Sequence, residues 1–164
     1  LDVYDKYIVF NKERNEKIKE TVKEILNGTE RARILILTKS LDHGRTLDNS
    51  FKGLQSEFLE GACSVGERYE SISRFRNHGE GSILIGTRIL QTGINIEEIT
   101  HFINARGMKS EIATIQALGR ALRISDNKDK VYVYDFMDKE KYLSQHSRER
   151  IKHYKKEGHE VIMI

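Results

Sequence analysis

Ile34-Leu35-Ile36-Leu37 is the stretch that decides the fold, because four aliphatic residues in a row lie between polar and charged neighbours. Such a run is typical of a strand that is covered on both faces in a parallel sheet. Ile83-Leu84-Ile85 repeats this pattern, and His101-Phe102-Ile103-Asn104 repeats it more weakly. Val131-Tyr132-Val133-Tyr134 is β-branched and aromatic throughout, which also favours a strand. We therefore predict that these four segments are strands of one sheet.

Amphipathic segments separate the predicted strands. Residues 12–26 place apolar side chains at helical spacing, and Asn27-Gly28 is a pair suited to ending that helix. Further helices are predicted at about 42–54, 66–77 and 109–123, with a long basic one at about 139–157. The closing residues 161–164 either add a last strand or cover the core. Because each crossover is long enough for a right-handed connection, the pattern predicts an α/β fold with a doubly wound, mainly parallel sheet flanked by helices.

The size and composition of the chain are those of one globular domain. It has 164 residues, of which 38% are hydrophobic, and we find no internal repeat or low-complexity linker. We expect a single domain over residues 1–164, with a leading linker and helix at 1–29 and a basic helix and end segment at 138–164. Because the sequence begins with Leu1 and not with methionine, we expect it to be a piece of a longer protein.

Charge and cysteine content narrow the location and the partners. The net charge of +3 permits binding to nucleic acid but does not require it. No apolar run approaches the ~20 residues of a membrane span, and no signal peptide opens the chain. A lone cysteine, Cys63, excludes an internal disulfide and fits a reducing compartment. We therefore expect a cytoplasmic protein, in the host cytoplasm if the source is a phage, with no membrane partner.

The octet Gln116-Ala117-Leu118-Gly119-Arg120-Ala121-Leu122-Arg123 lies within one of the predicted helices. On a helix, Gln116, Arg120 and Arg123 fall on one stripe and the leucines fall on the opposite face. Gly119 removes a side chain beside that stripe. Guanidinium groups are always charged and present a rigid fork of donors, so this pair suits a phosphate ester better than a lysine pair would. The alternative interpretation is a solvated basic helix face.

The ends of the predicted strands carry further candidate ligands. In open parallel sheets, ligands bind beyond the carboxyl ends of the strands. Thr38-Lys39-Ser40 follows the first predicted strand, and Gly86-Thr87-Arg88 follows the second, so both offer hydroxyl groups and a cation. The loop that comes next supplies Gly93 for close backbone approach and Asn95 for hydrogen bonding.

Taken in order, these segments resemble the C-terminal RecA-like lobe of superfamily 2 helicases and translocases. Residues 34–40 look like motif IV, residues 66–76 like the segment after motif IVa, and residues 83–96 like motif V. Gln116-x-x-Gly119-Arg120-x-x-Arg123 looks like motif VI, and the resemblance extends from about residue 30 to 136. Because motif VI begins with glutamine, where many RNA enzymes carry histidine, the chain is most similar in style to UvsW-like phage helicases and to restriction-enzyme-type DNA helicases. This resemblance implies a RecA-like, three-layer fold.

The resemblance also implies roles for particular residues. Arg120 and Arg123 would be arginine fingers that reach the γ-phosphate of ATP, and Gln116 would orient that end of the nucleotide. The residues implied for the ribose and phosphate side of the cleft are Gly93, Asn95 and Gly119, although the family usually carries aspartate where this chain has Asn95. The residues implied to contact the sugar-phosphate backbone of nucleic acid are Thr38, Lys39, Thr87 and Arg88.

The phosphate cradle expected of an ATPase has no counterpart in this sequence. The chain contains neither Gly-x-x-x-x-Gly-Lys-Ser/Thr nor an Asp-Glu pair at the end of a strand. We therefore expect ATP with Mg²⁺ to be held mainly by an N-terminal RecA-like lobe of the same polypeptide, which is absent from this chain, and we expect the isolated chain to be inactive.

The predicted function is that of the second motor lobe of an ATP-dependent DNA helicase or translocase that unwinds DNA or moves a branch point. Its predicted nucleic acid partner is branched DNA or a junction of single strand and duplex. The alternatives are an RNA helicase lobe and a non-catalytic module for nucleic acid binding or protein docking.

Several other residues allow two interpretations each. The basic residues Arg148, Lys152 and Lys155 or Lys156 recur at helical spacing and either follow a DNA backbone or form a solvated face. His43 and Arg45 either touch nucleic acid or are structural, and Asp135 is either a turn residue or a nucleotide contact. Cys63 is expected to be a small buried side chain. The spacing of His146, His153 and His159 does not indicate a metal site.

Overall fold

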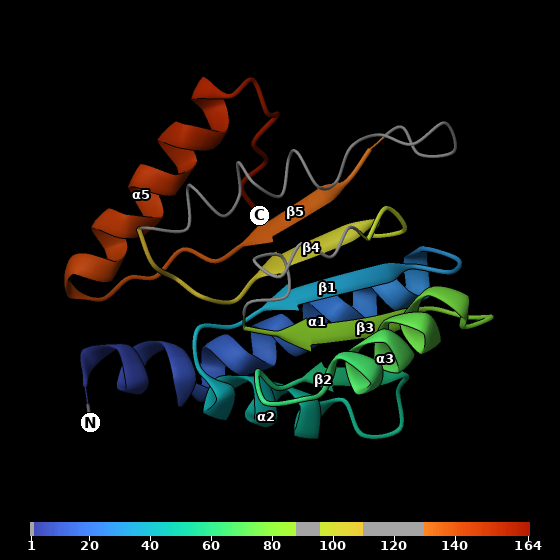
Figure 1. Cartoon of the computed structure of the whole chain (residues 1–164). Coiled ribbons are helices and arrows are strands. Elements are labelled where there is room, and N and C mark those ends of the chain that lie inside the picture. Colours follow the sequence, from blue (N-terminus) through green and yellow to red (C-terminus); the bar gives the residue numbers. More distant parts are fainter. Residues whose placement is uncertain (1, 88–95, 110–129) are drawn as a thin grey trace.

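A computed structural model describes residues 2–87, 96–109 and 130–164 (Figure 1). Over these residues the chain forms a five-stranded sheet in the order β2-β3-β1-β4-β5, and every paired strand is parallel to its neighbour. The strands are β1 (Arg33–Leu37), β2 (Ser56–Leu59), β3 (Ser82–Gly86), β4 (His101–Asn104) and β5 (Tyr132–Asp135). The prediction of a parallel α/β sheet is confirmed.

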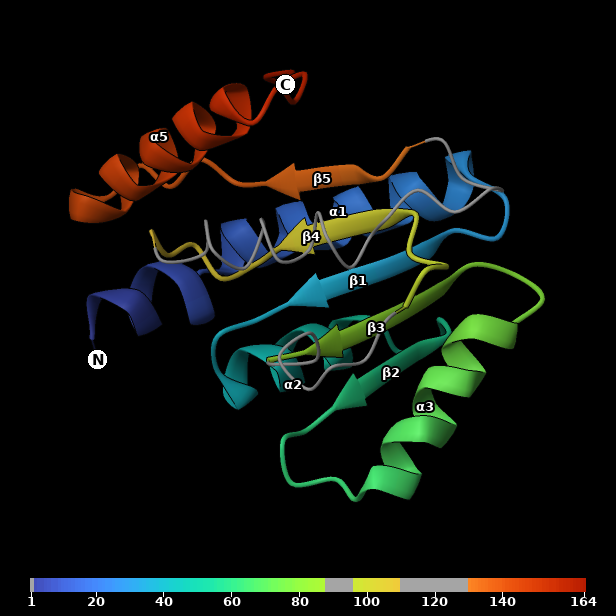
Figure 2. The same cartoon turned by 45° about the horizontal axis from the view of Figure 1, so that its top comes forward.

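Helices cover both faces of this sheet, which gives three layers. The helices α1 (Lys12–Gly28) and α2 (Leu41–Ser50) lie on one face, and α3 (Val65–Asn77) lies on the other (Figures 1 and 2). The basic helix α5 (Lys141–Lys156) lies at the β5 edge of the sheet. A short π-helix, η1 (Asp5–Val9), forms within the leading segment, where the sequence indicated only a linker.

Strand β1 lies in the middle of the sheet, and its position requires a continuous aliphatic run. Successive side chains of a strand point to opposite faces. Ile34 and Ile36 pack in the hydrophobic cluster beneath α1 and α2, whereas Leu35 and Leu37 pack in the cluster beneath α3. All five residues of β1 are buried. A polar residue at any of these four positions would therefore face a packed core.

Helices α1 and α3 each begin at a residue whose side chain caps the first turn. Asn11 precedes α1 and accepts a hydrogen bond from the Arg14 amide at 3.1 Å. Ser64 and Glu67 form a reciprocal capping box at the start of α3, with distances of 2.7 and 3.2 Å between side-chain oxygen and amide nitrogen. Both devices satisfy amide groups that the first turn of a helix leaves without partners.

Strand β2 was not predicted. The helix predicted at about 42–54 ends at Ser50, and residues 56–59 then form an edge strand that pairs with β3. Gly44 makes this packing possible, because a Cβ atom at that position would lie 2.4 Å from a ring atom of Phe58. Helix α2 therefore sits directly against β2.

Most of the remaining predicted elements are confirmed by the structure. The other four strands and the helices at 12–26, 66–77 and 139–157 are confirmed, with ends shifted by one or two residues. Residues 161–164 neither form a strand nor cover the core, since Ile162 is 73% exposed and Ile164 is fully exposed. The helix predicted at about 109–123 lies almost entirely outside the described residues.

Candidate functional site

The carboxyl ends of the strands bring together segments that are distant in the sequence. Leu37 at the end of β1 is paired with Gly86 at the end of β3 and with Asn104 at the end of β4. Thr38 and Thr87, which come next along their chains, therefore lie at the same edge of the sheet. This is the edge at which open parallel sheets bind their ligands.

Arg106 ties this edge together. Its Nε donates a hydrogen bond to the carbonyl oxygen of Thr38 at 3.2 Å, and its Nη2 donates one to the carbonyl oxygen of Thr87. Its own amide donates to Oδ1 of Asn104 at 3.3 Å. Arg106 is only 8% exposed. One guanidinium group thus fixes Thr38 and Thr87, the first residues after β1 and β3, relative to each other.

The described residues that follow β1 and β3 differ in how far their side chains are exposed. Lys39 is exposed, and its Nζ lies 4.8 Å from the centre of the Tyr4 ring and 3.8 Å from Sδ of Met108. Thr87 is half-buried. Thr38 is completely buried, and its hydroxyl donates to the carbonyl oxygen of Ser40 at 3.2 Å. The burial of Thr38 argues against the direct backbone contact predicted for it.

The other predicted site residues lie outside the described part of the chain. These are Arg88, Gly93, Asn95, Gln116, Gly119, Arg120 and Arg123. Their roles therefore remain predictions from the sequence.

The leading segment of the chain packs onto the same edge. The hydroxyl of Tyr4 donates to the carbonyl oxygen of Arg106 at 2.8 Å, and Ile8 packs with Leu143 of α5. Gly107 has a φ of +72°, and a Cβ atom there would lie 2.8 Å from Cδ1 of Ile8. Only glycine adopts such a backbone conformation at little cost and leaves room for Ile8.

Asp135, at the end of β5, holds the basic helix in place. Nε and Nη2 of Arg150 donate to its two carboxylate oxygens at 2.8 and 3.0 Å. The hydroxyl of Tyr154 donates to the same carboxylate at 2.7 Å, and Nδ2 of Asn104 does so at 3.3 Å. Both interpretations of Asp135 from the sequence, as a turn residue or a nucleotide contact, are wrong, because the residue ends a strand and its carboxylate is taken up by internal donors.

Asp138 extends this network towards α1. Its carboxylate accepts from Nε of Arg14 at 2.9 Å and lies 3.6 Å from Nη2 of Arg150. Nη1 of Arg14 donates to the carbonyl oxygen of Ala105 at 3.0 Å. Burial alone would lower the pKa of Arg150, but the charges of Asp135 and Asp138 outweigh this effect and raise it. The edge of the sheet next to the loops is therefore braced by buried ion pairs.

His43 and Arg45 differ in exposure, so only His43 is removed from any ligand surface. His43 is completely buried, and its Nε2 lies 3.0 Å from Oδ1 of Asn15, so it does not touch nucleic acid. Arg45 is exposed and pairs with Glu60 at 2.9 Å. Cys63, expected to be buried, is half-buried beside the cluster under α3.

The burial of His43 predicts a pH dependence of stability. Burial and, to a smaller extent, the charge of Arg14 lower the pKa of His43 to about 3. Below pH 6.5 the histidine of the unfolded chain takes up a proton that the folded chain does not, so its contribution is present at pH 7 and is lost as the pH falls towards 3. Between pH 7 and pH 5 this residue should lower the free energy of unfolding by about 2 kcal/mol.

The check is chemical denaturation of the wild type and His43→Gln at both pH values. The variant lacks the titrating group, so its free energy of unfolding should fall less between pH 7 and pH 5. Identical pH dependence in the two proteins would show that His43 does not titrate in this way.

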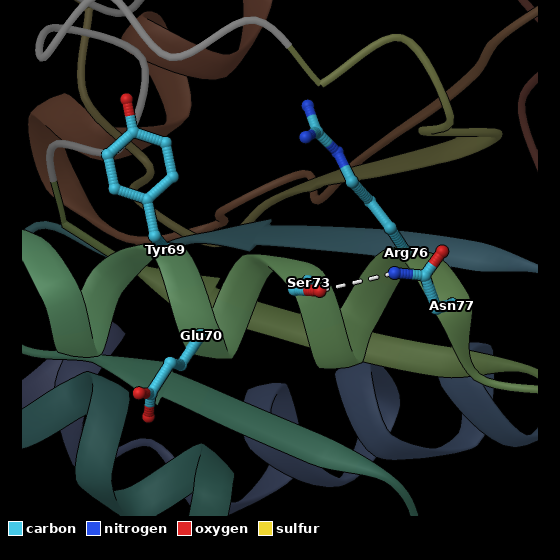
Figure 3. A pocket seen from close by; sticks show the side chains of 5 residues that line it. All are labelled: Tyr69, Glu70, Ser73, Arg76 and Asn77. Carbon is cyan, nitrogen blue, oxygen red and sulfur yellow. Dashed lines mark hydrogen bonds between the residues drawn. The ribbon is translucent and has the colours of Figure 1, made fainter.

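A shallow pocket on α3 is separate from the carboxyl edge. It is lined by Tyr69, Glu70, Ser73, Arg76 and Asn77, and Figure 3 shows Tyr69 and Arg76 projecting on the same side of the helix. Nδ2 of Asn77 donates to Oγ of Ser73 at 3.2 Å. All five residues belong to α3, and none is a predicted site residue.

Two features are absent from the described residues. No group of three or more His, Cys, Asp or Glu side chains there could hold a metal ion. Among the same residues, no helix combines the length and apolar character needed to cross a membrane.

The architecture and its edge define the class of the protein. A parallel sheet with helices on both faces, and with hydroxyl and basic side chains beyond its strand ends, is typical of the doubly wound proteins that bind phosphate-containing ligands. Residues 14–125 match the family model described as the helicase conserved C-terminal domain. The chain belongs to this family and is a C-terminal lobe of the superfamily 2 helicase type, as its motifs predicted.

Individual relatives agree with this assignment. The chain is 25% identical over 168 aligned positions to the ATP-dependent DNA helicase uvsW of Enterobacteria phage T4, covering 92% of this chain and 33% of that protein. The crystal structure of T4 UvsW superimposes with a TM-score of 0.74 at 22% identity, covering 92% of this chain and 34% of that one, which confirms the RecA-like fold.

Two other relatives carry different descriptions. A putative ATP-dependent RNA helicase of Methanocaldococcus jannaschii is 32% identical over 126 positions, covering 71% of this chain and 16% of that protein. The Sulfolobus solfataricus SWI2/SNF2 ATPase core in complex with dsDNA has a TM-score of 0.59 at 22% identity, covering 78% of this chain and 27% of that one. The chain thus spans about a third or less of the length of each of these relatives.

Proposed function

We propose that this chain is the second motor lobe of an ATP-dependent DNA helicase or translocase, which unwinds DNA or moves a branch point. The observation that carries the proposal is the meeting of the loops after β1 and β3 at one edge of the sheet. Arg106 bridges the carbonyl groups of Thr38 and Thr87, so the first residues after β1 and β3 are held together. The family membership supplies the ATP-dependent class of reaction.

The nucleic acid contacts in this proposal are made by Lys39, Thr87 and Arg88. A hydroxyl group and two cations can hold phosphate oxygens without reading the base sequence, which a translocating protein needs because it must release one phosphate and take the next. Thr38 is left out because its hydroxyl is buried.

The ATP contacts in this proposal come from the segments that resemble motifs V and VI. Arg120 and Arg123 would stabilise the charge that develops on the transferred phosphoryl group, and Gln116 would orient it. Gly93, Asn95 and Gly119 would line the ribose and phosphate side. We assign the phosphate cradle and the Mg²⁺ site to an upstream lobe of the complete protein. We place this protein in the cytoplasm, where ATP is abundant.

The test is ATP hydrolysis by the complete protein that carries this lobe, measured with forked DNA, blunt duplex DNA and RNA of the same sequence. We expect forked DNA to stimulate turnover most, because a junction presents both a strand and a duplex. Stimulation by RNA alone would favour the RNA helicase alternative, which the relative from Methanocaldococcus jannaschii supports. Turnover that no nucleic acid stimulates would contradict the motor function and favour a binding or docking module.

A further inference from the structure

Helix α5 concentrates the positive charge of the chain. Its 16 residues include six Lys and Arg and one Glu, whereas the whole chain has a net charge of +3. The rest of the chain is therefore slightly acidic. A local excess of positive charge is typical of surfaces that bind nucleic acid.

One face of α5 is fixed to the sheet. Leu143 and Ser147 are buried, and Arg150 is bound to the carboxylate of Asp135 with only 1% of its side chain exposed. Tyr154 donates to the same carboxylate. These contacts recur every three or four residues along the helix, so its rotation about its own axis is determined.

The opposite face forms what we call the basic stripe: Arg148, Lys152, Lys155 and Lys156. All four side chains are exposed, and that of Lys152 is 74% exposed. Lys152 has a weak pair with Glu149 at 3.7 Å. Within residues 2–87, 96–109 and 130–164, no carboxylate forms an ion pair with Arg148, Lys155 or Lys156.

The composition of the stripe favours one kind of partner. Along the stripe, Arg148, Lys152 and then Lys155 or Lys156 lie three or four residues apart, or about 5–6 Å along the helix axis. Single strands are bound largely by stacking on aromatic rings, but none of the four stripe residues is aromatic. The tyrosines of α5 have other neighbours, since Tyr154 is turned towards Asp135 and the centre of the Tyr142 ring lies 5.3 Å from that of His146. A straight row of cations without stacking partners fits the regular backbone of a duplex.

We propose that the basic stripe binds the sugar-phosphate backbone of a DNA duplex arm outside the strand that the loops after β1 and β3 would contact. This inference rests on the proposed function. The buried contacts of Asp135 to Arg150 and Asn104 connect the stripe to the end of β4, next to Arg106. The duplex contact and the strand contacts are therefore held in a fixed relation by the hydrogen bonds that join α5, the end of β5 and the end of β4.

The test compares two charge-reversal variants of the complete protein. The first is Arg148→Glu/Lys152→Glu/Lys155→Glu in the stripe. The matched control is Lys12→Glu/Lys17→Glu/Lys23→Glu, which changes three exposed residues of α1 and produces the same net charge. Binding of a fluorescently labelled blunt DNA duplex is measured by anisotropy over a range of salt concentrations.

We expect the stripe variant to lose about tenfold or more in duplex affinity and its log–log salt slope to flatten by about 2–3, while the control changes little. A neutral variant, Arg148→Gln/Lys152→Gln/Lys155→Gln, should show a smaller loss of duplex affinity. It controls for misfolding caused by the added glutamate residues. Equal losses in the stripe and control variants would mean that only net charge matters and would overturn the proposal, as would unchanged binding in the stripe variant.

Failure of this inference can be told apart from failure of the proposed function. ATP hydrolysis stimulated by single-stranded DNA depends on the loops after β1 and β3 and should persist in the stripe variant. If duplex affinity is unchanged in that variant while single-strand stimulation is present in the wild type, the stripe is excluded and the motor function stands.

Discussion

ATP hydrolysis by the complete protein is expected to fall by on the order of 10³-fold or more when Arg120 or Arg123 is replaced by alanine. In the proposed motor each guanidinium group reaches across to a γ-phosphate gripped by the upstream lobe. Charge builds on the phosphoryl oxygens during transfer, so a fixed cation at that place stabilises the transition state more than bound ATP. The measurement is kcat and KM for ATP at saturating forked DNA.

The pattern of the loss distinguishes a finger from a structural arginine. Both alanine variants should lower kcat far more than they raise KM. Lysine variants should recover only part of the loss, because an ammonium group lacks the planar fork that binds two oxygens at once. Arg74→Ala is the matched control, since Arg74 is an exposed arginine that pairs with Glu57 at 2.6 Å and has no proposed contact with ATP. Undiminished turnover in both alanine variants would exclude the finger assignment.

Three of the four strands that the sequence predicted, β1, β3 and β4, are buried throughout, whereas the fourth, β5, is partly exposed and was predicted from its β-branched and aromatic residues. For β1 and β3, burial on both sides requires an aliphatic residue at nearly every position, and this leaves a run that is visible in the sequence. Strand β2 lies at the edge of the sheet, where only Leu59 is buried, so Ser56 and Glu57 are tolerated and no run appears. A glycine within the preceding helix, Gly44, was the available signal of close packing there.

The sequence allowed us to propose where the candidate site lies, but not which buried contacts hold it together. The hydroxyl and basic residues after the predicted strands led us to place the site at the carboxyl edge, and the pairing of β1 with β3 brings Thr38 and Thr87 to that edge. Arg106 could not be identified in the same way, because its partners are backbone carbonyl groups, which every residue has. The burial of Thr38 was also hidden, since a threonine after a strand looks the same whether its hydroxyl faces a ligand or a neighbouring carbonyl group.

The contacts of Asp135 are a further feature that only the fold discloses, and they have a large predicted effect on stability. The side chains of Arg150 and Asp135 are 1% and 17% exposed, so both groups are largely removed from water. Removing one partner of a buried ion pair leaves the other charge without compensation and is strongly destabilising, whereas breaking an exposed pair has little effect.

Replacing Asp135 with asparagine is therefore expected to lower the free energy of unfolding by about 3–5 kcal/mol. The asparagine side chain is similar in size, but it carries no charge and turns an NH₂ group towards either Arg150 or the hydroxyl of Tyr154. Urea denaturation followed by circular dichroism measures the change, and Glu60→Gln is the matched control, because it removes a carboxylate from an exposed pair with Arg45. The control should unfold like the wild type. If Asp135→Asn did so as well, the buried pair would not be what holds α5 against the sheet, and the fixed orientation of the basic stripe would lose its physical basis.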